Sequence, residues 1–308
     1  MTPTRRRWAT LLPAALVVLA AAGPGQAHDE PTGKSEVHDL AATASGTQVS
    51  VTGHAAFGGQ PAVTVGEDAA GDSAGGAATA EMGLDFTGLT IAAPNPAKPE
   101  LLFTMKLAGM EGGGIPELFQ YNWDIIVDGG APNGSNWSIK TMRSQAATGS
   151  TNPWAIIADC QPNPQTGGFT CREVARIPVV YEEGEASIRL TVPLARIEAS
   201  PGSVIEAWAR NGEPVWVRTS AAGQLTGFVN ADDMTHDTYT VPKSTVRLAL
   251  APAGTPEANV DFSKTATLGA EGNFTGTLTA PGPGTYDVWA KACFAENCGT
   301  ASTPVSIT

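Results

Sequence analysis

The stretch TQVSVTGHAAF, residues 47–57, alternates apolar and polar side chains along its whole length. Successive side chains of a β-strand point to opposite faces, so this period of two predicts a strand with one buried face. The segments LLFTMKL (residues 101–107) and YNWDIIVD (residues 121–128) repeat the alternation and indicate a fold of many short strands. The expected buried face of the first strand carries Val49, Val51, Gly53, Ala55 and Phe57.

The composition also favours an all-β protein. The 308 residues include 35 glycines and 23 prolines, and long amphipathic helical patterns are scarce. We predict a large antiparallel β-sandwich over residues 46–243 and a small immunoglobulin- or fibronectin-like sandwich over residues 244–308. Residues 28–45 are small and polar, which predicts a flexible lead-in. Alternatively, residues 36–57 could complete the C-terminal module by pairing with its edge strand.

The first 27 residues have the three regions of a secretory signal peptide. Arg5, Arg6 and Arg7 form a basic region, residues 9–22 are apolar, and the small residues of 25–27 suit a cleavage site. A glycine and a proline at 23–24 end the apolar run before it is long enough to span a bilayer. We therefore expect a secreted, extracellular protein with no membrane span.

The charge of the chain bears on its partners. Its 18 basic and 30 acidic residues give a formal net charge of −12, and removal of the arginines in the signal segment would make it more acidic. Nucleic acids and anionic membrane surfaces repel so acidic a protein. We predict no nucleic-acid partner, whereas a divalent cation would be attracted.

Four cysteines follow the signal segment, and an even number in an oxidising compartment predicts disulfides. Three pairings are possible. We expect the local one, Cys160 with Cys171 and Cys293 with Cys298, because each pair brackets a turn-rich segment. A zinc site is the weaker alternative, because the chain has no C-x-x-C spacing and only four histidines.

An acidic, glycine-rich loop over residues 66–83 suggests a calcium site. Asp68, Asp72 and Asp85 lie in or beside this loop. Calcium takes six to eight oxygen ligands, which carboxylates and inward-folded loop carbonyls can supply. We predict that these three residues hold a structural calcium ion. The alternative is a solvated loop without a metal.

Two groups of short motifs resemble DOMON-like β-sandwich modules. DAAGD (residues 68–72), followed by LDFTGL (residues 84–89), resembles their entry segment. VPL (residues 192–194), followed by SPG (residues 200–202), resembles the turn before a late strand. The resemblance covers residues 60–240. It implies a sandwich that binds sugar, haem or calcium, although an evident Met/His pair for haem is missing.

A competing hypothesis comes from GDSAG at residues 71–75, which satisfies the G-x-S-x-G motif of serine hydrolases. Ser73 would be the nucleophile and His236 the base. The motif needs a buried strand before it and a helix after it, whereas residues 66–70 are polar and flexible. We therefore predict a non-catalytic protein that binds extracellular polysaccharide or a cell-envelope component, with the serine hydrolase as the alternative.

Overall fold

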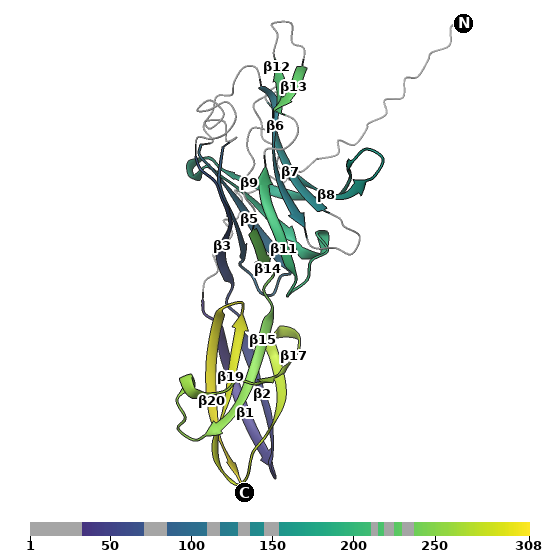
Figure 1. The fold of residues 1–308 in the computed structure, drawn as a ribbon. Helices are drawn as coiled ribbons and strands as arrows, with labels where there is room; N and C mark the ends of the chain where they lie inside the picture. Colours follow the sequence, from purple (N-terminus) through teal and green to yellow (C-terminus); the bar gives the residue numbers. More distant parts are fainter. Residues whose placement is uncertain are drawn as a thin grey trace, which may run out of the picture.

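The computed structural model describes residues 33–70, 85–109, 118–128, 136–144, 154–210, 215–218, 225–229 and 237–308. Their regular elements are β-strands and short 3₁₀ turns, so the all-β prediction is confirmed. All the strand pairs are antiparallel. Figure 1 shows two β modules joined end to end. None of the helices in these ranges has the length and apolar character needed to cross a membrane.

The smaller module is a sandwich of two four-stranded sheets, ordered β1-β2-β18-β17 and β16-β15-β19-β20. Side chains from both sheets share one core, in which Val49 and Val51 meet Leu248, Phe274 and Val288. Its strands are β1 (Glu36–Ser45), β2 (Gln48–Ala56), β15 (Ser244–Pro252), β16 (Lys264–Thr265), β17 (Thr267–Leu268), β18 (Asn273–Thr279), β19 (Gly284–Phe294) and β20 (Asn297–Ile307). Two turns, η3 (Glu257–Asn259) and η4 (Ala270–Gly272), also belong to it.

This arrangement corrects the boundaries expected from sequence. Residues 36–45 form strand β1 and are not a flexible lead-in. Strand β2 belongs to the smaller module and not to a first module starting at residue 46, because Gln48–Ala56 pairs with β18 along its length. The alternative placement of residues 36–57 is the one observed. The larger module is therefore inserted between β2 and β15, and the smaller module is built from both ends of the chain.

The larger module is one sheet that curls until its end strands approach each other. Its path is β3-β4-β5-β10-β9-β8-β7-β6-β11-β14, and the β12–β13 hairpin extends the edge of β6. The end strands β3 and β14 are in contact but share no ladder of backbone hydrogen bonds. The inward side chains form a second core that includes Phe86, Phe103, Ile157 and Leu190.

The strands of the larger module are β3 (Gln60–Glu67), β4 (Phe86–Ala93), β5 (Glu100–Leu107), β6 (Leu118–Asp128), β7 (Asn136–Ser144), β8 (Trp154–Asn163), β9 (Gly168–Glu182), β10 (Ser187–Pro193), β11 (Val204–Arg210), β12 (Val215–Arg218), β13 (Leu225–Val229) and β14 (Asp237–Thr240). Its short turns are η1 (Glu183–Glu185) and η2 (Leu194–Arg196).

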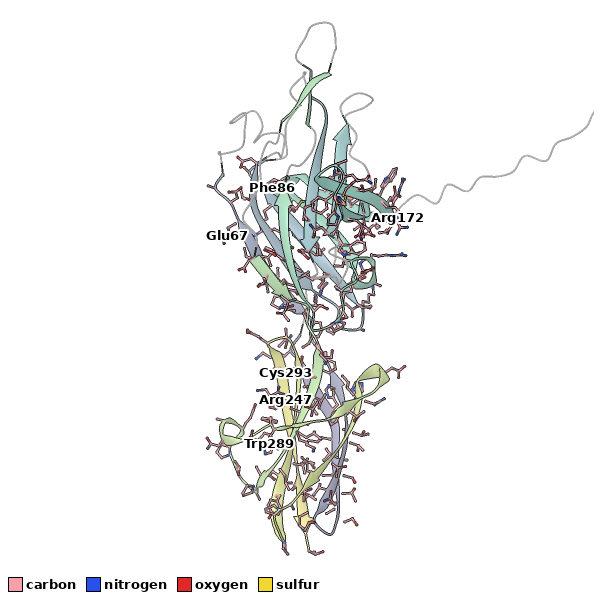
Figure 2. The ribbon with its side chains drawn as sticks, turned by 45° about the vertical axis from the view of Figure 1, so that its right-hand side comes forward. Glu67, Phe86, Arg172, Arg247, Trp289 and Cys293 are labelled. Atoms are coloured by element: carbon pink, nitrogen blue, oxygen red, sulfur yellow. A yellow bond between two sulfur atoms is a disulfide. The ribbon has the colours of Figure 1, made fainter. Side chains whose placement is uncertain are left out.

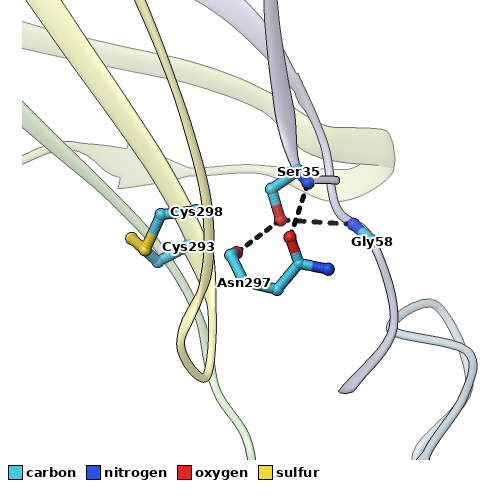
Figure 3. The surroundings of a disulfide bond; sticks show 5 residues. All are labelled: Ser35, Gly58, Cys293, Asn297 and Cys298. Carbon is cyan, nitrogen blue, oxygen red and sulfur yellow. Dashed lines mark hydrogen bonds between the residues drawn. A yellow bond between two sulfur atoms is a disulfide. The ribbon is translucent and has the colours of Figure 1, made fainter. Parts of the chain in front are cut away.

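Both expected disulfides are present. Cys160–Cys171 joins directly opposed residues of β8 and β9, and Cys293–Cys298 joins directly opposed residues of β19 and β20. The first lies at the base of a hairpin tip, residues 161–170, whose side chains are mostly exposed. The second lies beside the junction between the modules (Figure 3). The first cross-link thus holds a hairpin tip that has little core of its own.

Asn297, at the start of β20, ties the N-terminal segment and the first crossing between modules to the β19–β20 hairpin. Its side-chain oxygen accepts from the backbone N–H of Ser35 at 2.9 Å. Its amide nitrogen donates to the carbonyl oxygens of Gly33 at 3.1 Å and Gly59 at 3.0 Å. The Ser35 hydroxyl donates to the Asn297 carbonyl and accepts from the N–H of Gly58, as Figure 3 shows. These contacts fix the position of the crossing.

Candidate functional site

The predicted calcium ligands lie at one end of the β3–β4 pair. Asp68 follows β3 and Asp85 precedes β4, and Glu67 opposes Gly88 in the antiparallel register. Figure 2 shows Glu67 and Phe86, their sequence neighbours, in the larger module away from the junction. Asp85 is fully buried, whereas Asp68 is partly exposed and accepts from the N–H of Ala69 at 3.0 Å.

The third predicted ligand, Asp72, lies outside the described residues. Within the ranges that the structure covers, there is no cluster of three or more histidine, cysteine, aspartate or glutamate side chains that could hold a metal. The structure thus brings Asp68 and Asp85 to the same strand end, and calcium binding stays a prediction. Ser73 and His236 of the hydrolase hypothesis also lie outside the described residues.

A hollow of about 430 Å³ with a mixed polar and apolar lining lies on the outer face of β4, β5 and β10. Strand alternation produces it: Phe103 and Met105 point into the core, so Thr104 and Lys106 point outward. We call it the outer-face hollow. Its lining includes Thr90, Thr104, Lys106, Glu185, Ser187 and Arg189, and the start of β3 contributes Pro61.

The sheet register aligns the polar side chains of the outer-face hollow across neighbouring strands. Thr90 opposes Thr104 across β4 and β5, and Thr104 opposes Arg189 across β5 and β10. Lys106 opposes Ser187 two positions along, on the same face of the sheet. Two hydroxyl groups and a guanidinium therefore form one row across three hydrogen-bonded strands. The backbone ladder fixes the spacing of these residues, of which Thr90 is 8 % exposed and Thr104 is partly exposed, so a ligand has only side-chain rotamers to order.

An ion pair fixes the guanidinium at the end of that row. Arg189 Nη1 lies 2.9 Å from Glu182 Oε1, and its Nη2 lies 3.9 Å from Glu185 Oε2. Burial raises the pKa of Glu182, and a hydrogen bond with Glu185 raises it further, against the attraction of Arg189. Arg189 is 22 % exposed and lines the hollow, so its paired side chain is still partly accessible there.

A second concavity, which we call the seam groove, follows the gap between end strands β3 and β14. Its volume is about 1000 Å³. The buried Tyr239 bridges the gap and donates from its hydroxyl to Gln60 Oε1 at 2.5 Å. Burial raises the pKa of Tyr239, which keeps this hydroxyl protonated as a donor. Other lining residues are Lys34, Pro61, Val63, Thr238, Thr240, Lys243 and residues 295–298.

The two concavities meet at edge strand β3, because Pro61 lines both of them. The seam groove also combines three parts of the chain: the N-terminal segment, the two crossings between modules and the tip of the β19–β20 hairpin. Sequence reasoning missed both surfaces. Alternation places Thr104 and Arg189 on outer strand faces, but only the pairing of β5 with β10, about 85 residues apart, brings them together.

No family model matches this chain, and no curated protein matches it either.

Proposed function

We propose that this protein is exported and acts as a non-catalytic binding protein for extracellular polysaccharide, including polysaccharide of the cell envelope. The row formed by Thr90, Thr104 and Arg189 in the outer-face hollow is the observation that supports this function. Sugar rings present many hydroxyl groups, each of which can both donate and accept a hydrogen bond. Threonine hydroxyls do the same, and a guanidinium only donates.

Rigid placement of these groups supports binding. All three lie on paired strands of the sheet, and Arg189 is held by Glu182. A preorganised site loses little side-chain entropy when it binds, so modest contacts suffice for useful affinity. The signal segment and the two disulfides support export into an oxidising compartment.

The geometry of the nearby carboxyl groups supports binding without hydrolysis. Glycosidases place two carboxyl groups on either side of the bond they cleave, about 5–9 Å apart. Glu182 and Glu185 instead both pair with the guanidinium of Arg189, at N···O distances of 2.9 Å and 3.9 Å. These two carboxyl groups are thus used to hold that side chain. The three residues serve as a charged support for the hollow.

The test is retention of the purified protein on insoluble neutral polysaccharides, such as cellulose and chitin, and on isolated cell envelopes. Thr90→Val and Thr104→Val remove hydroxyl groups while conserving side-chain shape. Each should weaken saturable retention about fivefold, because about 1 kcal/mol is lost with each ligand hydrogen bond. Thr277→Val, on an exposed position of β18 in the smaller module, is the matched control and should bind normally.

Absence of saturable retention on every material, or equal retention by all three variants, would contradict the proposal. A fluorophosphonate probe examines the hydrolase alternative at the same time. Covalent labelling that Ser73→Ala abolishes would replace the binding function with hydrolysis.

A further inference from the structure

Three exposed lysines line the surface that the outer-face hollow and the seam groove form together. Lys106 lies in the hollow, and Lys34 and Lys243 lie in the groove. None of the three forms an ion pair with another residue in the described part of the chain. Their amines are therefore available to a ligand.

We propose that the seam groove extends the polysaccharide site and binds a chain that carries carboxylate groups, with Lys34 and Lys243 as the recognising residues. This inference rests on the proposed function and specifies its ligand class. One polymer would lie in the outer-face hollow, cross β3 at Pro61, and continue along the seam.

Local charge supports an anionic ligand. Lys34 and Lys243 line the seam groove with one carboxylate, Glu296. The outer-face hollow adds Lys106, while its Arg189 is paired with glutamates 182 and 185. The lining is thus cationic on a chain that is acidic overall. At physiological salt, charges interact mainly within about 8–10 Å, so this lining governs a bound polymer more than distant acidic residues do.

The edges of the groove favour a polysaccharide over a peptide. An extended peptide binds such a seam by adding a strand to an exposed edge. Strand β3 is a poor template because Pro61 lacks a backbone N–H and the β3–β4 register shifts twice. Strand β14 has only four residues. These edges are better suited to a ligand that binds the protein's side-chain hydroxyl, amide and amine groups than to one that pairs with its backbone.

The groove exists only when the modules hold their relative position. Lys34 and residues 295–298 come from the smaller module, whereas Gln60 and Thr240 come from the larger one. Asn297 lines the groove and binds the carbonyl oxygen of Gly59 at the crossing. Anionic selectivity should therefore depend on the module junction, whereas the outer-face hollow lies within one module.

The experiment compares polygalacturonate with its methyl ester, which has the same backbone without the charges. We expect the intact protein to bind the acid at least about fivefold more tightly than the ester at physiological salt, where the distant acidic residues are screened, since each exposed charge pair contributes up to about 1 kcal/mol. This preference should disappear in the Lys34→Gln/Lys243→Gln variant. Lys264→Gln/Lys291→Gln makes the same charge change outside the groove and should keep it.

Equal binding of acid and ester by the intact protein would overturn the inference. So would an equal loss of preference in both double variants, which would show a general charge effect. The proposed function is tested separately by Thr104→Val. If this variant binds both polymers more weakly, and the intact protein shows no preference for the acid, then the hollow binds sugar but the lysines do not select an acidic polymer. The inference would also be refuted if the groove bound an extended peptide and neither of the two polymers.

Discussion

Replacement of Asn297 by alanine should loosen the junction between the two modules. The substitution removes three side-chain hydrogen bonds, to Ser35, Gly33 and Gly59, which lie on two separate chain segments. It leaves the backbone carbonyl of Asn297 in place as the acceptor for the Ser35 hydroxyl. The perturbation is therefore confined to the contacts that hold the N-terminal segment and the first crossing.

The three bonds set the expected magnitude. A typical protein hydrogen bond contributes about 1 kcal/mol net, so Asn297→Ala should lower the free energy of unfolding by about 3 kcal/mol. Ser35 is 1 % exposed, so its N–H loses its acceptor away from solvent, which adds to the cost. Asn297→Asp should cost at least as much, because a carboxylate oxygen would then face the carbonyls of Gly33 and Gly59.

Urea unfolding followed by tryptophan fluorescence measures this effect. Asn259→Ala is the control, because this exposed asparagine of η3 lies away from the junction and should change the free energy by less than about 0.5 kcal/mol. If Asn297→Ala were no more destabilising than Asn259→Ala, the side-chain contacts of Asn297 would not stabilise the junction.

Three further predictions concern backbone fit, a disulfide and a buried carboxyl group. Gly299→Ala should destabilise the protein by more than about 3 kcal/mol in the same unfolding assay, because its Cβ would overlap the carbonyl oxygen of Ser35; a fully stable variant would contradict that close approach. Replacing Cys160 and Cys171 by serine should cost about 3 kcal/mol on the loop-entropy estimate and expose residues 161–170 to proteolysis, whereas an equally resistant hairpin would show that the disulfide is dispensable. Burial raises the pKa of Glu182 above 4.5, so the folded state holds a proton that the unfolded chain releases, and stability should fall as pH rises from about 4.5 through the raised pKa. Glu182→Gln should flatten that part of a urea-midpoint profile, and an unchanged slope would mean that another group causes it.

Strand β2 shows what periodicity can predict and what it cannot. Alternation predicted both the strand and its buried face, and Val49, Val51 and Ala55 are buried. It did not assign the strand to a module, because β18, its partner, lies more than 200 residues away in the chain. The sequence order suggested contiguous modules, but the pairing makes the larger module an insertion.

The difference between local and non-local contacts also explains why the disulfides could be predicted and the binding surfaces could not. Cys160 and Cys171 flank a short turn, so local geometry brings them together and sequence spacing is informative. The outer-face hollow requires β5 to pair with β10, and the seam groove requires two distant edge strands and the β19–β20 tip to converge. Such non-local pairings leave no signature in the residues themselves, so the polar row could not be predicted.

The most direct test of the proposed function is hydroxyl-radical footprinting of the protein with and without a saturating polysaccharide. Bound polymer should protect Pro61, Leu102 and Lys106, which line the outer-face hollow, whereas Phe169 on the β8–β9 hairpin, 56 % exposed, should stay fully reactive. Protection of Phe169 with an unchanged hollow would move the binding surface to that hairpin and contradict the proposed function of the outer-face hollow.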